Sequence, residues 1–317
     1  MKNIYSNIFK VNNKNISKAI NCLKKKGLIG IPTETVYGLA GNAYSSEAVK
    51  KIYYLKKRPF INPLIVHYYK FEHLKNDVDL NNNFFKLYKK FSPGPITFIL
   101  KKKKNSQLSS TTTAKLRTVA VRFPKNKTIR KILKSLNFPL AIPSANKSSH
   151  ISPVSAEDVA QEFKGLLKII INDGPCKIGL ESTVVDLTSK PKILRPGLIS
   201  PVAISNTLNK KIRVIHNSKN IKAPGMLKRH YSPGIPIKLN QIKAKNNEAF
   251  IVFGKKYKKG KNIFNLSYKS NLNEAAKNLY RILRLIKNKN YKMINVCSIP
   301  HTGIGLAIND RLNRAAK

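Results

Sequence analysis

The sequence predicts an α/β protein: a twisted mixed sheet with a basic concave cavity, followed by a small doubly wound α/β domain. Between residues 10 and 205, short β-rich runs alternate with helical stretches such as 46–56 and 155–163. This mixture is typical of a sheet covered by helices. The predicted strands are LIGIP, NPLIVH, ITFIL, TVAVRF, LAIPS, KIIIN and STVVDL. The length of 317 residues favours two domains over one.

The second domain is predicted from a separate alternation near the C-terminus. The runs AFIVFG, NIFNLS and MINVC are expected strands, and residues 272–286 and 305–316 are expected helices. A Pro/Gly-containing stretch, APGMLKRHYSPGIP, precedes them and is typical of a linker. We therefore divide the chain into a main domain at 1–205, a linker at 206–236 and a small domain at 237–317.

Charge is the most unusual property of the composition. Sixty-one Lys and Arg against fourteen Asp and Glu give a formal charge of +47, which indicates nucleic acid, an anionic membrane or an acidic substrate as a partner. The lysines are spread along the whole chain, however, as compositional drift would also produce. Both interpretations stay open at this point.

The cysteines and the apolar runs indicate a cytoplasmic protein. Cys22, Cys176 and Cys297 lie far apart and form no C-x-x-C pair, so neither a disulfide framework nor a thiolate zinc site is expected. No apolar run approaches about 18 residues and the first residues contain no apolar signal core, so we expect neither membrane spanning nor secretion.

The segment IPTETVYGLA, residues 31–40, follows the apolar run GLIGI, and Pro32 ends the predicted strand. If the segment stays extended, alternate side chains share one face. The sequence then predicts a row of hydroxyl groups at a strand end, from Thr33, Thr35 and Tyr37.

Familiar catalytic motifs are absent: the chain has no G-x-x-x-x-G-K-[ST] loop, no H-E-x-x-H and no G-x-S-x-G. Instead, predicted strands and helices end repeatedly in hydroxyls, amides or cations. Such donors bind phosphate and carboxylate oxygens and favour catalysis that holds anions together. These groups are Lys56 with Arg58, Thr118 with Arg122, Ser144 with Asn146, Ser182, and Arg195.

Each of these features also has a structural interpretation. Ser and Thr after a strand often cap turns, and lysines often lie on a solvated face. Arg122 lies on a strongly apolar strand and needs an anionic partner, whether a ligand or a carboxylate. Glu34 and Glu181 could be catalytic or could pair with nearby cations, and His67 could be a core histidine.

The motifs together resemble the long, two-domain form of the threonylcarbamoyl-AMP synthase family. They occur in the family's order, from residue 27 to 231, and the tail GIGLAINDRLNRAA resembles the end of that form. The resemblance implies a YrdC-like catalytic domain and a Rossmann-like C-terminal domain. The motifs are PTETVYGL, KKRPFINPLIVH, FSPGPITFIL, TVAVRFP, PLAIPSAN, ESTVVDL, LRPG and PGMLKRHYSP.

The resemblance implies that L-threonine, bicarbonate and ATP are joined to threonylcarbamoyl-AMP and pyrophosphate, for modification of tRNA by downstream transferase proteins. Mg²⁺ is implied with the ATP, without a visible protein ligand set. Lys56 and Arg58 would be catalytic. Threonine would be bound by Thr35, His67, Arg122, Ile142 and Ser182. ATP would be bound by Lys56, Arg58, Asn62, Thr118, Ser144, Asn146, Ser152, Arg195 and Tyr231.

Tyr231, beside His230, belongs to the linker, which the resemblance expects to fold over the nucleotide as a gate. The chain departs from the family pattern in three places. Lys57 replaces a usual glycine, Ser148–Ser149–His150 stands where a glycine commonly follows Ser-Ala-Asn, and Ser92 replaces an aromatic residue before Pro-Gly-Pro. These changes affect loop geometry around the expected nucleotide.

Two other functions compete with the synthase. One is a double-stranded RNA or tRNA binding module without catalysis, whose basic concave surface accepts a phosphate backbone. Possible weak tRNA binding is also expected of the synthase itself. The other is a carbamoyl or acyl transferase domain detached from its usual partner. An RNA groove needs exposed cations, whereas the PSAN and ESTVVD stretches would have no purpose in it.

Overall fold

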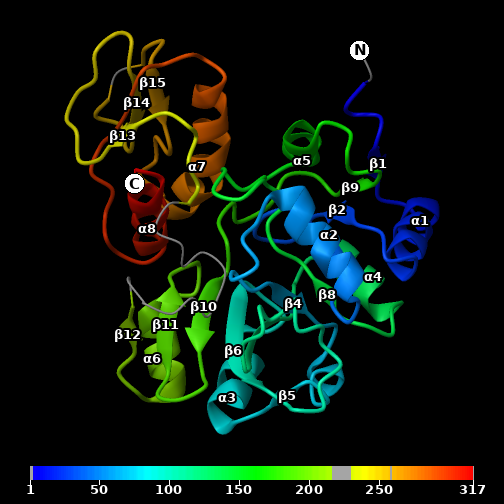
Figure 1. The fold of residues 1–317 in the computed structure, drawn as a ribbon. Coiled ribbons are helices and arrows are strands. Elements are labelled where there is room, and N and C mark those ends of the chain that lie inside the picture. Colours follow the sequence, from blue (N-terminus) through cyan, green and yellow to red (C-terminus); the bar gives the residue numbers. More distant parts are fainter. Residues whose placement is uncertain (1–2, 216–229, 258, 317) are drawn as a thin grey trace.

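A large mixed sheet and a small parallel sheet form the framework of the molecule (Figure 1). The computed structural model describes residues 3–215, 230–257 and 259–316. The large sheet has twelve strands in the order β1-β9-β2-β3-β8-β4-β7-β6-β10-β11-β12, with β5 paired to β6. Its strands are β1 (Ile8–Lys10), β2 (Ile29–Ile31), β3 (Gly38–Asn42), β4 (Ile65–His67), β5 (Val78–Asp79), β6 (Ile96–Lys102), β7 (Thr118–Arg122), β8 (Leu140–Ala141), β9 (Ile170–Asn172), β10 (Thr183–Asp186), β11 (Lys192–Arg195) and β12 (Arg213–Val214).

Asparagine and serine side chains start most of the helices. In seven helices the residue before the first turn accepts a hydrogen bond from a backbone N–H of that turn, so a free donor at the helix start is satisfied. These helices are α1 (Asn13–Lys24), α2 (Ser46–Lys56), α3 (Asn82–Phe91), α4 (Lys127–Lys134), α5 (Ala156–Phe163), α6 (Pro201–Leu208) and α7 (Leu272–Lys287). A short 3-10 turn, η1 (Phe71–His73), and the last helix, α8 (Gly305–Ala315), have no such side-chain cap.

Two apolar clusters hold helices onto the large sheet. Helices α1 and α4 bury residues at helical spacing, such as Ile16 and Leu23, with Ile29 and Ile31 of β2. Helices α2 and α3 bury Ile52 and Phe84 in a second and larger cluster. Helices from both clusters therefore pack against the sheet, as the alternating runs predicted.

The small sheet contains β13 (Ile237–Lys238), β14 (Ala249–Val252), β15 (Ile263–Asn265) and β16 (Ile294–Val296), in the order β13-β16-β14-β15. All of its pairings are parallel. Helix α7 connects β15 to β16 and packs against α8, and Figure 1 shows α7 between the small sheet and the larger part of the molecule. The predicted α/β class, with a twisted mixed sheet and a second, smaller α/β domain, is confirmed.

The predicted domain limits stay predictions. Strand β12 still pairs with the large sheet at Arg213–Val214, and β13 starts at Ile237. Of the predicted linker, residues 216–229 lie outside the described residues. No helix among the described residues is long and apolar enough to cross a membrane.

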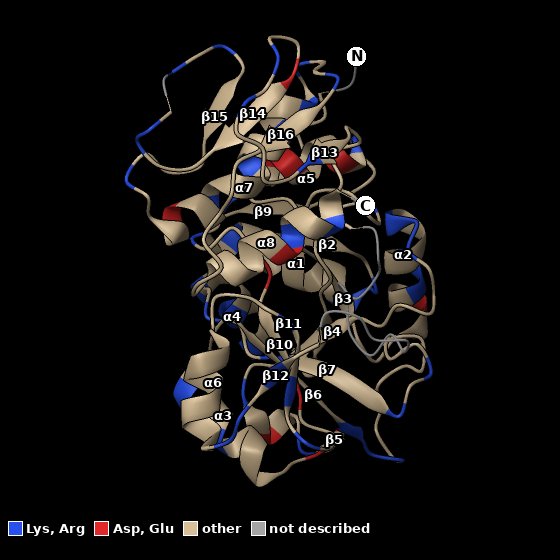
Figure 2. Ribbon diagram, turned by 90° about the vertical axis from the view of Figure 1, so that its left-hand side faces the viewer, with Lys and Arg blue, Asp and Glu red and all other residues tan. Residues whose placement is uncertain are grey.

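Basic side chains are distributed over the molecule. Figure 2 shows Lys and Arg on helices, strands and loops of both parts, with only scattered Asp and Glu. This distribution does not define one binding face, so the net charge by itself does not locate a site.

Helix α7 docks onto the main domain through a close backbone approach at Gly179. Gly179 has φ +81°, and a Cβ there would lie 2.6 Å from the Cα of Lys277. Farther along α7, Arg284 donates from Nη2 to the carbonyl oxygen of Ile151 at 2.5 Å. The absence of a side chain at Gly179 therefore lets the two parts meet.

We predict that Gly179→Ala destabilises the protein by more than the cost of its backbone angle alone. Gly165→Ala is the matched control, because Gly165 has φ +83° and no atom lies within 4 Å of the position that its Cβ would take. The control should cost about 1–2 kcal/mol, and Gly179→Ala should cost about 1–3 kcal/mol more because α7 must move. Urea unfolding of both variants measures the difference, and equal losses would contradict the close docking.

Candidate functional site

Several predicted site residues line one buried cavity in the main domain. The cavity has a volume of about 40 Å³. It contains three arginines and one carboxylate, together with a histidine and a tyrosine from the predicted linker. The lining residues are Val36, Arg58, Ile65, Arg122, Ile142, Pro143, Ser144, Glu181, Arg195, His230 and Tyr231. Stretches that are distant in the sequence therefore converge, as the donor-rich pocket predicted.

The mixed directions of the strands produce this convergence. Strands β4 and β7 are parallel, so His67 lies opposite Arg122 where both strands end. Strand β6 is antiparallel to β7, so Thr97 near its start also lies opposite Arg122. Strands β10 and β11 are antiparallel, and Val184 near the start of β10 pairs with Arg195 at the end of β11. The ends of β4, β7 and β11 therefore lie on the same side of the sheet as the starts of β6 and β10.

Arg122 has its anionic partner inside the protein. Its Nη2 donates to Oε1 of Glu34 at 2.7 Å, and both side chains are buried. The other oxygen of Glu34 accepts from the backbone N–H groups of Lys125 and Asn126 at 3.0 and 3.2 Å. Against the opposing effect of burial, Arg122 and these hydrogen bonds hold the pKa of Glu34 below its usual value. Arg122 Nε is buried without a hydrogen-bond partner in the described structure.

His67 lies beside this ion pair as a neutral side chain. It is 1% exposed, and its Nδ1 lies 3.3 Å from the carbonyl oxygen of Ile65. Burial, and then the charge of Arg122, lower its pKa well below the usual range. His67 therefore combines the two interpretations given to it: it is a core histidine, and it lies next to a site arginine.

Lys56 and Arg58 organise the loops around the cavity. The Lys56 Nζ donates to the carbonyl oxygens of Ser144, at 2.5 Å, and of Asn146. Burial and the neighbouring Arg58 lower the pKa of Lys56 well below its usual value. Arg58 donates from Nη2 to Oδ1 of Asn62 at 2.5 Å and to the carbonyl oxygen of Pro63 at 2.8 Å. Burial lowers the pKa of Arg58 to about 10.

Two of the departures from the family pattern keep a glycine-like backbone. Lys57 ends α2 in the left-handed conformation, with φ 49°, and Ser149 has φ 67°. Glycine fits this region most easily, so this chain adopts a glycine-like backbone at both positions with non-glycine residues.

Arg195 lines the cavity, and Ser182, which is not a lining residue, holds its guanidinium in place. The Ser182 carbonyl oxygen accepts from Nε and Nη2 of Arg195 at 3.1 and 3.0 Å, and the Ser182 hydroxyl lies 2.7 Å from the Thr97 hydroxyl. Arg195 is 3% exposed. These contacts fix the guanidinium plane at the cavity, a device that suits recognition of planar or tetrahedral anions.

Glu181 connects the cavity to the C-terminal domain. Its Oε2 accepts from Nε of Arg311 on α8 at 2.8 Å and from the hydroxyl of Tyr280 on α7 at 2.9 Å. Its Oε1 accepts from the Ser152 hydroxyl at 2.6 Å. Although burial opposes it, the charges of Arg311 and Arg195 lower the pKa of Glu181 to about 2. The interpretation of Glu181 as a structural partner of cations is thus confirmed.

His230 and Tyr231 sit in the cavity itself. Tyr231 is 1% exposed, and its ring stacks on Tyr280 with a centroid distance of 5.7 Å. Arg311 lies 5.2 Å from the Tyr231 ring centroid. Burial lowers the pKa of His230 to about 3, so this histidine is neutral at pH 7. This end of the predicted linker therefore contributes two residues to the lining of the cavity.

The expected extended row at residues 31–40 is wrong. Strands β2 and β3 pair antiparallel, and residues 34–36 form a bend between them. The Thr33 hydroxyl accepts from the backbone N–H groups of Thr35 and Val36, which draws the segment into a turn instead of a strand. Thr35 is fully buried there, and its hydroxyl lies 2.8 Å from that of Thr33.

The remaining predicted residues differ in their distance from the cavity. Asn62, Asn146, Ser152 and Lys56 do not line it, but each contacts a lining residue or its loop. Thr118 is the first residue of β7 and Arg122 is the last, so their side chains lie on the same face of the strand. Thr118 does not line the cavity. Arg311 was missed entirely, because a residue 130 positions away in sequence from Glu181 gives no local signal.

Comparison with known proteins shows the family of the chain and agrees with its fold. Residues 21–197 match the family model described as "Telomere recombination", and residues 199–317 match "Threonylcarbamoyl-AMP synthase, C-terminal domain". Threonylcarbamoyl-AMP synthase of Pyrococcus abyssi is 35% identical, over 94% of this chain and 93% of that protein. The Bacillus subtilis protein of the same name is 34% identical, over 96% and 94%. The chain belongs to the threonylcarbamoyl-AMP synthase family.

The similarity to the family extends to the whole fold. The crystal structure of P. abyssi Sua5 complexed with L-threonine superposes with a TM-score of 0.90, at 33% identity, over 98% of this chain and 97% of that one. Escherichia coli YciO gives a TM-score of 0.53 at 24% identity, over 59% of this chain and 94% of that one, which shows a shared fold only. The two-sheet arrangement is therefore that of the long family form.

We predict that the stability of this synthase-family chain falls in acid because of Glu181 and Glu34. Both have folded-state pKa values below those of an unfolded glutamate, so their stabilisation is present above about pH 4.3 and is lost as the pH falls through the folded-state pKa, which for Glu181 is about 2. For Glu181 the loss amounts to about 3 kcal/mol. Urea unfolding between pH 2 and pH 7 measures this loss.

The matched variants are Glu181→Gln and Glu47→Gln. Glu181→Gln should lower stability at pH 7 and flatten its fall with acid. Glu47→Gln removes an exposed carboxylate paired with Lys26 and Lys51, and should leave the profile close to that of the unchanged protein. An unchanged acid profile for Glu181→Gln would contradict the role of the buried contact.

Proposed function

We propose that this chain is an L-threonylcarbamoyladenylate synthase, a nucleotidyltransferase that joins L-threonine, bicarbonate and ATP to threonylcarbamoyl-AMP and pyrophosphate for tRNA modification. One observation carries the proposal: Arg58, Arg122, Ser144 and Arg195, from four separate stretches, line the same buried cavity. Membership of the family supports it. A relative with the same overall fold was crystallised with L-threonine, and we infer that this chain binds threonine too.

The cavity suits a reaction that collects anions. The threonine amine and bicarbonate give a carbamate with loss of water, and a carbamate oxygen then attacks the α-phosphorus while the bond to pyrophosphate breaks. Every reactant in the second step is negatively charged. Arg58, Arg122 and Arg195 are fixed by hydrogen bonds before any ligand arrives, so they can stabilise developing charge without rearrangement.

Arg122 is the proposed partner of the threonine carboxylate. Glu34 accepts from one edge of the Arg122 guanidinium, and the buried Nε of Arg122 has no hydrogen-bond partner in the described structure. A buried donor without a partner is costly, so a ligand carboxylate that accepts from it gains binding energy. The Lys56 ammonium is held by two loop carbonyls and so positions the Ser144–Asn146 loop, and the catalytic role expected for Lys56 and Arg58 stays a prediction.

The linker residues His230 and Tyr231 are proposed to move when substrates bind. A cavity of about 40 Å³ holds only a few water molecules, whereas ATP and threonine need several times that space. His230 and Tyr231 occupy part of the lining and come from a segment that joins the two domains. Their displacement would open the site and their return would cover the nucleotide.

Mg²⁺ is proposed to enter with ATP. Among the described residues no group of three or more His, Cys, Asp or Glu could hold a metal ion. Mg²⁺ commonly keeps several waters and binds through substrate phosphates. The downstream tRNA threonylcarbamoyl transferase proteins and the cytoplasmic location stay predictions.

The RNA-binding alternative does not fit the burial of the cavity. Arg58, Arg122 and Arg195 are 7%, 4% and 3% exposed. A phosphate backbone needs cations at the surface. These arginines can therefore act only on a ligand that enters the cavity.

The proposal is tested by pyrophosphate release from the full chain with MgATP, bicarbonate and L-threonine. We expect release that requires both threonine and bicarbonate, because the carbamate supplies the attacking oxygen. Threonine-independent release, or none at all, would overturn the proposal. Omission of each substrate in turn provides the control.

Two variants of the buried ion pair separate binding from folding in the same assay. Arg122→Gln should raise the threonine KM by about tenfold or more, since a hydrogen bond to a charged group is lost, with a smaller effect on the ATP KM. Glu34→Gln disrupts the same pair but keeps the arginine, so its threonine KM should stay close to that of the unchanged protein. Equal increases for threonine and ATP in Arg122→Gln would contradict the assignment.

A further inference from the structure

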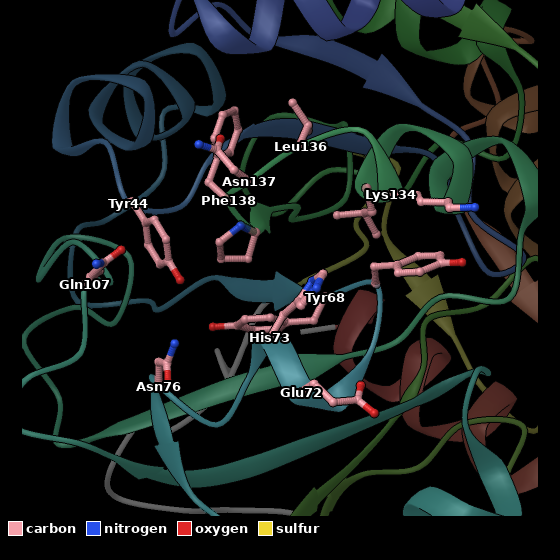
Figure 3. A pocket seen from close by; sticks show the side chains of 13 residues that line it. Tyr44, Tyr68, Glu72, His73, Asn76, Gln107, Lys134, Leu136, Asn137 and Phe138 are labelled. Carbon is pink, nitrogen blue, oxygen red and sulfur yellow. The ribbon is translucent and has the colours of Figure 1, made fainter.

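Two cavities of the main domain differ in whether their buried polar atoms are satisfied. The larger one, of about 460 Å³, lies beside the start of β8 (Figure 3). In it the hydroxyls of Tyr44 and Tyr68 both donate to Oδ2 of the buried Asp77, at 2.9 and 2.8 Å. None of its lining residues has a buried polar atom without a hydrogen-bond partner in the described structure. Its polar groups therefore do not require a ligand.

Around the candidate active site the opposite holds. Several buried polar atoms there have no hydrogen-bond partner in the described structure, among them Arg122 Nε, Asn62 Nδ2, Asn146 Oδ1 and the Tyr231 hydroxyl oxygen. A buried polar atom without a partner is costly, so these atoms mark where a ligand is expected to bind. Asn146 is the member of this set whose orientation is fixed from outside the site.

The side chain of Asn146 can point in only one direction. Asn146 is 1% exposed, and its Nδ2 donates to the carbonyl oxygens of Lys147 and His150, at 2.8 and 2.9 Å. Because carbonyl oxygens only accept, the amide nitrogen must face them and the amide oxygen must point away. Asn146 Oδ1 is therefore an acceptor, suited to a hydroxyl or amine hydrogen of a ligand.

The two carbonyls that orient Asn146 belong to a turn that needs support. The backbone N–H of His150 donates to the carbonyl oxygen of Lys147 at 3.1 Å, which closes the 147–150 turn. Inside it, Ser149 has φ 67°, a backbone conformation that is unfavourable for a residue with a Cβ. This is also a stretch in which the chain departs from the family pattern. Contacts from elsewhere must therefore stabilise the turn.

Glu162 on α5 provides these contacts. Its Oε1 accepts from the backbone N–H of Lys147 at 2.9 Å and lies 2.7 Å from Nδ1 of His150. Although burial opposes it, the hydrogen bonds from His150 and Lys147 hold the pKa of Glu162 below its usual value, so the carboxylate is ionised at pH 7. A carboxylate only accepts, so His150 Nδ1 carries the hydrogen. One side chain thus fixes both residues whose carbonyls bind Asn146.

The small domain contacts the same turn through Arg284 on α7. Arg284 Nη1 lies 3.8 Å from Oε2 of Glu162, and its Nη2 donates to the carbonyl oxygen of Ile151, the residue after the turn. Its Nε lies 3.7 Å from Oδ2 of Asp158, also on α5. Arg284 therefore supports Glu162 and the end of the turn together.

We propose that Glu162 is a positioning residue for nucleotide binding. It holds the 147–150 turn so that Asn146 Oδ1 faces the ligand, and Arg284 extends this support to the small domain. The proposal rests on the proposed synthase function, in which Asn146 contacts ATP. Neither Glu162 nor Arg284 lines the candidate active site, so both act through the turn and not by touching the ligand.

The test measures MgATP affinity of the full chain by isothermal titration calorimetry. Glu162→Ala should weaken MgATP binding by about fivefold, the loss of one hydrogen bond between Asn146 and the nucleotide. Its threonine KM in pyrophosphate release should stay close to that of the unchanged protein. Glu162→Gln keeps an acceptor oxygen and should lose less affinity. Equal losses in the two variants would overturn the support through hydrogen bonds.

A double variant distinguishes positioning from a general structural role. If Glu162 acts through Asn146, the combination of Glu162→Ala with Asn146→Ala should bind MgATP no more weakly than Asn146→Ala alone. Additive losses would overturn the proposal. Urea unfolding checks that each variant is folded.

Matched controls come from the same two helices. Glu157→Ala removes an exposed acid of α5 and should bind MgATP as the unchanged protein does. Arg284→Gln should weaken MgATP binding, whereas Arg281→Gln should not, because Arg281 is exposed on α7 and contacts the Asn278 side chain of its own helix. Equal affinities of the two arginine variants would overturn the role given to the small domain.

This proposal and the synthase function fail separately. MgATP binding by the unchanged protein without threonine-dependent pyrophosphate release would overturn the synthase function, while the titrations still decide the role of Glu162. Threonine-dependent release together with unchanged MgATP affinity in Glu162→Ala would overturn the positioning role alone.

Discussion

The burial of Glu181 among cations and hydroxyls is the interaction on which the arrangement of this molecule depends. One carboxylate accepts from Ser152 of the main domain, from Tyr280 on α7 and from Arg311 on α8. It also lines the cavity. A buried carboxylate without partners would carry a large desolvation penalty, so the C-terminal domain and the cavity wall stabilise each other. Docking of the second domain is thereby coupled to the electrostatics of the site.

The charge balance of the cavity explains why it suits anions. Three arginines line it, and two buried carboxylates, Glu34 and Glu181, are shared with further cations and backbone donors. Positive charge therefore remains in excess within a largely water-excluded volume. Electrostatic interactions are stronger there than in bulk water. An entering carboxylate or phosphate completes an arrangement of donors that the protein has already fixed.

Local chemistry explains what the sequence could and could not predict. The helix at 46–56 and the strand at 118–122 follow from side-chain periodicity and from serine or asparagine caps, which act within a few residues. The bend at residues 34–36 was missed because the Thr33 side chain competes with strand hydrogen bonding, an effect that propensity does not include. The contact between Arg311 and Glu181 was missed because it is set by domain docking and not by any neighbour in sequence.

If His230 and Tyr231 move on ligand binding, as proposed, ligand binding and opening of the cavity are one equilibrium. Tyr231 is buried against Tyr280 and Arg311, and both of these residues also contact Glu181. Movement of Tyr231 out of the cavity would expose apolar surface and break these ring contacts. Substrates must offset that cost with their own contacts to the arginines. Since the arginines contribute most to ligands with several negative charges, ATP, as a proposed substrate, would shift the equilibrium more than threonine with its single carboxylate. Under the proposed function, the nucleotide would therefore drive opening and closing of a site whose donors remain in place throughout.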